Sequence, residues 1–407
     1  MKSKIAFALC ALSYLFGGTV SMLLSANLPV VVPELLGRAV SESELAEIGA
    51  YLNAGFLYGW MIGGLLLGVV SDRIGRVRTL ALATALYGLA TCHVMFVQSW
   101  ELLLVSRFIA GFGVGGVLLV STVYISEIWK TESRAVALGV LAVAFPVGIV
   151  LSGSLTAVFA HWKHAFSLGV IPVLLAGAIW FFLSESDAWL ATRLPLQQKQ
   201  LQKPTLLAPE YRRNLVLGSI IYGAVLVGLW GLFSWLPTWV HGLLHGATDG
   251  QAERGLTMML LGMGGIIGGS FSGLLMRKWG SHYTLLFTFA GLILSCMVLF
   301  LTNRSFSPVI YVEMAVLSMF FGISQGALSG YIPALFPAEI RATATGICFN
   351  ICRFFTASAV FFVGALVKWL GGFSNALLTF ALAFVVAIIA AFFSPETEKE
   401  VEPKAGY

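Results

Sequence analysis

The chain has 407 residues, of which 58% are hydrophobic and only 11% are charged. A soluble domain could not bury this much apolar surface, so the composition indicates a membrane protein. The formal charge of +5 comes from basic residues spread over short loops, a pattern that argues against a nucleic-acid-binding protein.

Apolar segments of about 20 residues are typical of membrane-spanning helices. Twelve such segments are predicted, at 5–32, 48–70, 79–97, 102–126, 136–159, 165–184, 214–239, 255–276, 283–301, 309–334, 342–367 and 374–394. The longest polar stretch between them separates six helices from six. We therefore expect an all-α membrane protein with an N-terminal half at 1–184, a linker at 185–213, a C-terminal half at 214–394 and a tail at 395–407.

The distribution of lysine and arginine predicts the orientation of these helices. With the N-terminus in the cytoplasm, 17 of the 24 basic residues fall in cytoplasmic segments, five fall outside and two lie within helices. An even number of helices returns the tail to the same side. We expect a multi-pass protein of the bacterial inner membrane with both termini in the cytoplasm.

Two similar segments lie about two hundred residues apart, each between two apolar stretches. The first runs from Tyr124 to Gly139 and contains Arg134, and the second runs from Tyr331 to Gly346 and contains Arg341. Tyr, Arg and Gly recur at the same spacing in both. A duplicated half built from membrane helices is typical of secondary transporters, in which the substrate site lies where the halves meet.

The turn between the second and third predicted helices reads Gly68-Val-Val-Ser-Asp72-Arg73-Ile-Gly75-Arg76-Val-Arg78. This string resembles the signature of the major facilitator superfamily, and the resemblance extends over essentially the whole chain. The equivalent turn of the second half has Arg277 where the first half has Asp72.

In that family, this turn and the two duplicated segments hold the inner gate shut. Carried over by position, the resemblance implies a gate of charged residues at helix ends, formed by Asp72, Arg73, Arg76, Glu127 and Arg134 of the first half and by Glu339 and Arg341 of the second. Each pair contributes little alone, but a set of them can bias a two-state equilibrium.

Two arginines lie within predicted helices. Arg353 lies 12 residues beyond Arg341, or ~18 Å along its helix, near the middle of a ~30 Å hydrocarbon core. A charge at that depth needs a water-filled cavity, a partner or an anionic ligand. The alternatives are contact with substrate and a buried pair with Glu313, the main acid available within a helix. Arg107 is nearer an outer helix end, where a structural role and a ligand role both fit.

Further candidates for the substrate cavity are polar or amphipathic residues at mid-helix depth. Asn350 shares a helix face with Arg353. The others are Asn27, Tyr222, Trp230 and Gln325, each of which is also compatible with simple packing. Glu313 is the candidate for proton coupling. No motif for a cofactor, a metal, ATP binding or enzymatic catalysis is found.

The segments Gly231–Trp239 and Leu335–Arg353 resemble the branches of the superfamily that move organic acids with protons, such as the aromatic-acid, sialate/monocarboxylate and niacin-type porters. Members of those branches carry acids in the first helix, where this chain has Gly17 and Val20.

We therefore expect a secondary transporter, not an enzyme. By this reading it is a monomer in the lipid bilayer that moves a small organic anion, a carboxylate, by proton-coupled alternating access. The alternatives are a sugar or drug porter of the same superfamily and a non-transporting membrane receptor that kept the fold. A cationic substrate would require an acidic residue within the membrane, and Glu313 is the only candidate found in the sequence.

Overall fold

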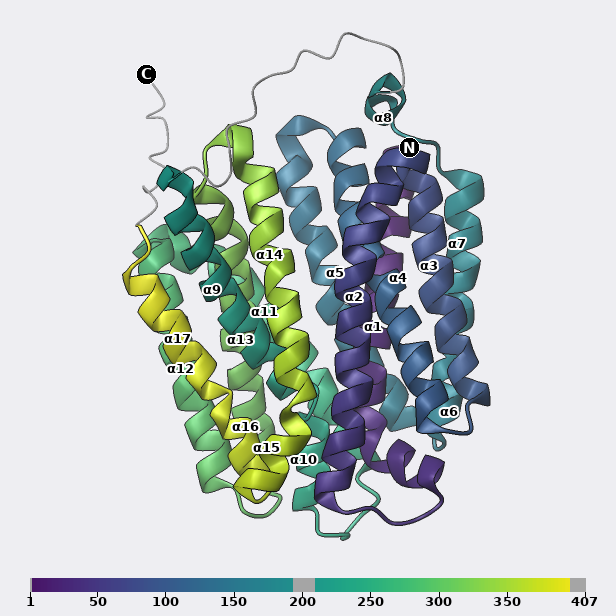
Figure 1. Cartoon of the computed structure of the whole chain (residues 1–407), viewed down its shortest axis with the longest axis vertical. Helices are drawn as coiled ribbons and strands as arrows, with labels where there is room; N and C mark the ends of the chain where they lie inside the picture. Colours follow the sequence, from purple (N-terminus) through teal and green to yellow (C-terminus); the bar gives the residue numbers. More distant parts are fainter. Residues whose placement is uncertain (1, 193–208, 396–407) are drawn as a thin grey trace.

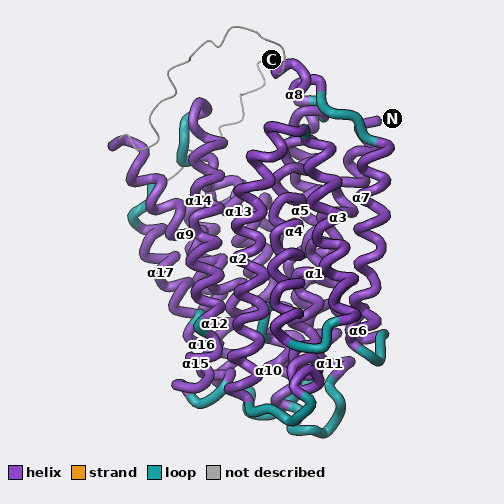
Figure 2. Tube along the Cα trace, turned by 45° about the vertical axis from the view of Figure 1, so that its right-hand side comes forward, coloured by secondary structure: helices purple, strands orange, loops and turns teal. Residues whose placement is uncertain are grey.

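The computed structural model describes residues 2–192 and 209–395. Within these ranges twelve helical segments are long and apolar enough to cross a membrane, each overlapping one of the predicted segments. The prediction of twelve spanning helices is confirmed. They stand side by side, as Figures 1 and 2 show. In Figure 1 the helices of the first half (purple through blue to teal) lie next to those of the second half (teal through green to yellow).

The helices of the first half are α1 (Lys2–Leu36), α2 (Glu42–Ile74), α3 (Arg76–His93), α4 (Trp100–Ile128), α5 (Arg134–Val158), α6 (Trp162–Ala165), α7 (Val170–Phe182) and α8 (Asp187–Thr192). The helices of the second half are α9 (Pro209–Phe233), α10 (Leu236–Leu243), α11 (Gln251–Trp279), α12 (Ser281–Thr302), α13 (Val309–Ala334), α14 (Ala338–Phe361), α15 (Val363–Leu370), α16 (Phe373–Thr379) and α17 (Ala381–Phe392). Residues 193–208, the greater part of the predicted linker, and 396–407, nearly all of the predicted tail, lie outside the described residues.

The seventh span was predicted as one continuous helix, but the structure shows two. It is divided into α9 and α10, with the break at Ser234 and Trp235. Pro237 has no N–H to donate to the carbonyl of Phe233, so the regular hydrogen-bond ladder cannot continue there. The chain tightens instead, with Trp235 N–H donating to Leu232 O at 2.9 Å.

The first helix begins and the last one ends at the same end of the bundle, which we call the terminal end (upper in Figure 1). At the opposite end the two halves are joined by polar bonds. The Glu42 carboxylate accepts from Phe373 N–H at 2.8 Å, at the start of α16. The Gln251 side chain donates to three carbonyls at the end of α5, those of Thr156, Ala157 and Phe159, at 3.0 to 3.2 Å.

Backbone packing closes the same end. A Cβ on Gly153 of α5 would lie 2.4 Å from Gly255 O of α11, so the two helices touch through their backbones. A Cβ on Gly364 of α15 would lie 2.6 Å from Glu47 Cα of α2. Side chains larger than hydrogen do not fit at either point.

The same helix pairs separate toward the terminal end. A Cβ on Gly139 of α5 or on Gly346 of α14 would meet no atom within 4 Å. Among the described residues, each hydrogen bond between the halves lies at the opposite end or, for Tyr58 and Ser358 at 2.9 Å, near mid-membrane. The halves therefore meet at the opposite end and diverge at the terminal end.

Replacing Gln251 by Ala is expected to favour the conformation in which the opposite end opens, because three bonds from the second half to α5 are lost. We expect the closed-to-open ratio to fall roughly fivefold to tenfold, the equivalent of about one net hydrogen bond or slightly more. Spin-label distances across the opposite end measure this ratio. Gln98→Ala, an exposed change in the loop before α4, is the control. Unchanged distances in Gln251→Ala would show that these bonds do not hold the closure.

Candidate functional site

Arg353 lies at the centre of the molecule, as the eleventh of the 19 residues in the span Thr343–Phe361. Its guanidinium carbon lies 4.8 Å from the centre of the Trp60 ring, a cation–π contact between α14 of the second half and α2 of the first. The side chain is half-buried. Within residues 2–192 and 209–395 it makes no hydrogen bond and no ion pair, so its donors are free for a ligand.

Trp60, which contacts Arg353, and three aromatic residues packed around it form what we call the aromatic wall: Phe56, Trp60, Phe145 and Trp230. The Trp60 ring lies 5.6 Å from those of Phe145 and Trp230 and 5.8 Å from that of Phe56, measured between ring centres. These side chains come from α2, α5 and α9, so both halves contribute. Only Trp230 was predicted; the other three were missed.

Two tyrosines pack against aromatic residues at this junction. Tyr14 of α1 packs against Phe145 at 5.3 Å between ring centres, and Tyr222 of α9 stacks at 4.1 Å on Phe349, one turn before Arg353 on α14. Tyr222 was predicted as a site residue, whereas Tyr14 was missed. Hydroxyl groups beside an arginine can accept from it or donate to a bound carboxylate.

Asn350 lies one turn before Arg353 on α14. Its amide donates to Gly346 O at 2.8 Å, and its carbonyl oxygen would lie 3.9 Å from a Cβ on Gly64 of α2. It therefore lines the same junction between the halves. Gln325 of α13 is half-buried, and its amide nitrogen is buried with no hydrogen-bond partner in the described part of the chain. No contact of Gln325 joins it to Arg353.

Arg107 has a structural role in this conformation. It is 1% exposed, and its terminal nitrogens donate to the α1 carbonyls of Val20 and Ser21 at 2.7 and 3.1 Å. Its guanidinium also lies 4.1 Å from the centre of the Phe56 ring. The structure thus ties Arg107 to α1 and to the edge of the aromatic wall, and leaves only its inner nitrogen without a partner.

Asn27 is not brought together with Arg353. It lies toward the opposite end, where its amide donates to Leu23 O and to Thr156 Oγ1 at 2.8 and 3.1 Å. There it borders a separate cavity of about 220 Å³. Mid-helix depth alone placed Asn27 in the site, but its side chain is bonded to Thr156 of α5 and faces this other cavity.

Glu313 also lies away from Arg353. It is the fifth residue of its span, near the opposite end, and accepts from Asn303 at 2.6 Å. The alternative of a buried Arg353–Glu313 pair is therefore wrong for this conformation. Within residues 2–192 and 209–395, no three His, Cys, Asp or Glu side chains are grouped so as to hold a metal ion.

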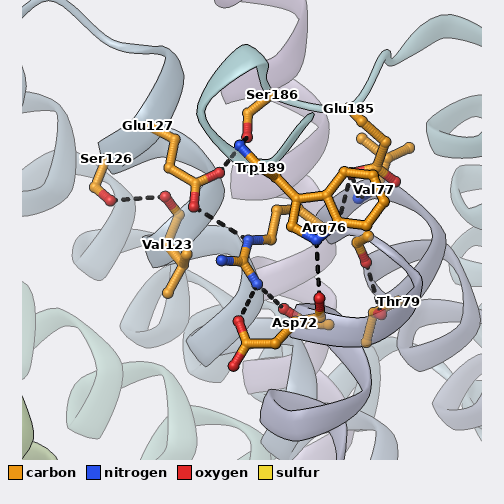
Figure 3. Close-up of polar contacts among 12 residues, drawn as sticks. Asp72, Arg76, Val77, Thr79, Val123, Ser126, Glu127, Glu185, Ser186 and Trp189 are labelled. Atoms are coloured by element: carbon orange, nitrogen blue, oxygen red, sulfur yellow. Dashed lines mark hydrogen bonds and ion pairs between the residues drawn. The ribbon is translucent and has the colours of Figure 1, made fainter. Parts of the chain in front are cut away.

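At the terminal end, three of the predicted gate residues come together within the first half (Figure 3). Arg76 pairs with Asp72 and, at 3.1 Å, with Glu127. Arg76 is the first residue of α3, and the carboxylates come from the last turns of α2 and α4. Three helix ends are thus held by one guanidinium.

The sequence interpretation missed a second part of this cluster, which lies in the segment that was read as linker. Glu185 accepts from the backbone N–H groups of Arg76, Val77 and Arg78 at 2.6 to 3.2 Å, at the N-terminus of α3. Ser186 donates to Glu127, and Trp189 donates to Asp72 O at 3.0 Å. The acid and the tryptophan that follow the sixth span could have indicated this part of the cluster. A carboxylate at that point suits a helix N-terminus, because the free N–H groups there can donate to it.

No described contact joins Arg73, Arg134 or Arg341 to this cluster. Arg73 is exposed, and the inner nitrogen of Arg134 is buried without a hydrogen-bond partner among the described side chains. Arg341 donates to Phe336 O at 3.1 Å within its own half. The side chain of Glu339 lies outside the described residues. This separation accompanies the divergence of the halves at the terminal end.

The central arrangement suits an anion with a flat, unsaturated or aromatic body. A free guanidinium offers two parallel donors to a carboxylate, and the Trp60 ring in contact with it would lie beside the body of such a ligand. Because the wall and Arg353 come from both halves, a bound ligand would touch both.

Comparisons with known proteins agree with this architecture. The model of the Major Facilitator Superfamily matches residues 10–359. The cis,cis-muconate transport protein of Acinetobacter baylyi is 27% identical over 98% of this chain and 96% of its own length. The 3-(3-hydroxy-phenyl)propionate transporter of Escherichia coli is 26% identical over 88% and 87%. A crystal structure of a D-xylose-proton symporter shares the fold, with a TM-score of 0.79 over 97% and 99% of the two chains at 19% identity. The predicted family is confirmed, and the chain belongs to the major facilitator superfamily.

Proposed function

We propose that this protein is a secondary transporter of small organic carboxylates with a flat, unsaturated or aromatic body. The observation that carries the proposal is Arg353, a mid-membrane guanidinium whose hydrogen-bond donors are free and which lies on an aromatic wall. The names of the two relatives, a muconate and a hydroxyphenylpropionate transporter, support the same substrate class.

The alternative of a cationic drug porter finds no support in the site, because no carboxylate lies beside the aromatic wall within the described residues. A sugar porter shares the fold, but a free guanidinium is better matched to an anion than to a neutral sugar. A receptor without transport would need neither the charged cluster of α2, α3 and α4 nor the divergence of the halves.

The orientation follows from the basic residues, which gather at the terminal end. We place this end in the cytoplasm, with the protein as a monomer in the bacterial inner membrane. The conformation with the terminal end open is then the inward-facing state. In the outward-facing state the terminal ends close, and the first-half cluster of Asp72, Arg76 and Glu127 would meet Glu339 and Arg341 of the second half.

A thermal-shift screen of the purified protein tests the substrate class. We expect benzoate, 3-hydroxyphenylpropionate and cis,cis-muconate to raise the unfolding temperature in a concentration-dependent way, by the usual linkage of binding to stability. Benzamide and neutral sugars should leave it unchanged, because they lack a charge for Arg353. Stabilisation by sugars or amines, without any by carboxylates, would contradict the proposal.

A further inference from the structure

The charges within the membrane are unbalanced. All 19 acidic residues of the chain lie outside the twelve spans or within six residues of the end of a span. Glu47 and Glu313 are the deepest of them, as the sixth and fifth residues of their spans. Arginine, in contrast, occurs in the interior at positions 107 and 353. Among the residues that the structure describes, no carboxylate lies at the depth of Arg353.

The two arginines differ in what surrounds them. Arg107 is buried, and two α1 carbonyls and the Phe56 ring compensate its charge in part. Arg353 has the Trp60 ring and no acceptor among the described residues. It is half-buried because the halves diverge on its terminal side, so water can solvate it in this conformation.

Alternating access requires this solvation to be removed. When the terminal ends close before the opposite end opens, Arg353 passes through an occluded state that is shut on both sides. An uncompensated charge in such an enclosure carries a large free-energy penalty. A bound carboxylate removes the penalty, because it forms a neutral pair with the guanidinium.

We propose that the protein works as an exchanger, in which one carboxylate is carried in and another is carried out, and that the substrate itself is the counter-ion of Arg353. The inference rests on the proposed function and adds its mode of transport. The loaded carrier crosses the occluded state readily, whereas the empty carrier crosses it slowly. Proton symport would instead need a titratable carboxylate near the substrate, and Glu313 lies near the opposite end, bonded to Asn303.

Proteoliposomes that hold the purified protein test this mode with radiolabelled cis,cis-muconate, a dicarboxylate that crosses protein-free bilayers poorly; uptake into protein-free liposomes is subtracted. We expect uptake into vesicles preloaded with unlabelled cis,cis-muconate to exceed uptake into empty vesicles by at least ~10-fold, since each 1.4 kcal/mol of barrier changes a rate tenfold. An imposed pH gradient should not raise the plateau of uptake. Equal rates into loaded and empty vesicles, or accumulation driven by the pH gradient, would overturn the proposal.

A substitution next to Arg353 gives a second test. Asn350→Asp places a carboxylate one turn from the guanidinium on α14, with little change in shape. The built-in acid would balance the charge of the empty carrier, so we expect the ratio of exchange to net uptake to fall toward one. Asn375→Asp is the matched control, because Asn375 also donates to a nearby carbonyl, that of Leu370, but is exposed at the opposite end. Its ratio should equal that of the wild type.

The outcomes separate the two proposals. If no carboxylate stabilises the protein or is taken up in either mode, the substrate class itself fails. If carboxylates bind and are taken up but empty vesicles fill as fast as loaded ones, only the exchange mode fails. If the ratio of exchange to net uptake is the same in Asn350→Asp as in Asn375→Asp, the role given to the charge of Arg353 is also contradicted.

Discussion

Replacing Arg353 by Ala is expected to abolish specific binding of carboxylates. The guanidinium is the only group at the junction of the halves, among the described residues, that offers an anion a positive charge with free donors. Alanine suits a membrane helix and leaves no buried charge behind, so folding should persist. Isothermal titration with benzoate measures the loss, and circular dichroism checks the fold.

The Lys variant separates charge from geometry at the same position. Arg353→Lys keeps the charge but loses the two parallel donors, so we expect benzoate to bind more weakly by ~1–3 kcal/mol, or roughly 5- to 150-fold. Arg304→Ala, an exposed change between α12 and α13, is the control and should bind like the wild type. If Arg353→Ala binds benzoate as tightly as Arg304→Ala does, Arg353 is a structural residue.

Removing the Trp60 side chain is expected to cause the second large loss of affinity for aromatic carboxylates. Trp60 is 4% exposed and contacts Arg353, Phe145 and Trp230, so Trp60→Ala takes away the centre of the aromatic wall. We expect aromatic carboxylates to bind ~1.5–3 kcal/mol more weakly, from lost apolar area and ring contact. Acetate, which has no ring, should be affected much less. Titrations with benzoate and acetate measure the difference.

Loss of a buried tryptophan also lowers stability, by about 3–5 kcal/mol in a typical core. Trp60→Phe keeps a ring beside Arg353 and should retain most of the preference for benzoate. Trp180→Ala is the control, because Trp180 is 55% exposed on the outer surface of α7. An equal loss of benzoate and acetate in Trp60→Ala would mean that Trp60 supports Arg353 without contacting the substrate ring.

The membrane architecture could be predicted from the sequence because one physical constraint dominates it. Each span needs about 20 apolar residues with internally satisfied backbone bonds, and that requirement is visible in the chain itself. The break between α9 and α10 was missed, although Pro237 marks it. Proline near a helix end and proline at a true break look alike until the packing around Trp235 is known.

The site was only partly predictable because it is made of common residues from distant segments. The chain has 30 Phe and 11 Trp, and nothing local distinguishes Phe56, Trp60 and Phe145 from the others. Arg353 could be singled out because a charge at mid-membrane depth is rare and costly. Asn27 and Arg107 satisfied a weaker rule, polarity within a helix. The structure instead bonds Asn27 to Thr156 of α5 and Arg107 to two carbonyls of α1.

The family resemblance of the turn at 68–78 and of the duplicated segments predicted which charged residues lie at the terminal end, but not how they are grouped. Asp72, Arg76 and Glu127 meet within one half, and Glu185 joins them from a segment that composition assigned to the linker. Helix-end hydrogen bonds of this kind depend on how neighbouring helix ends are placed in space, and composition does not report that placement.

Uptake of radiolabelled benzoate into proteoliposomes, in competition with unlabelled benzoate or benzamide, tests the central claim most directly. The two competitors have nearly the same shape and differ in the charge that Arg353 would bind. We predict that wild-type vesicles preloaded with benzoate take up the label, that benzoate suppresses uptake and that benzamide does not, and that Arg353→Ala vesicles take up no more than empty liposomes. Equal suppression by both competitors, or wild-type rates in Arg353→Ala, would contradict recognition of a carboxylate by this arginine.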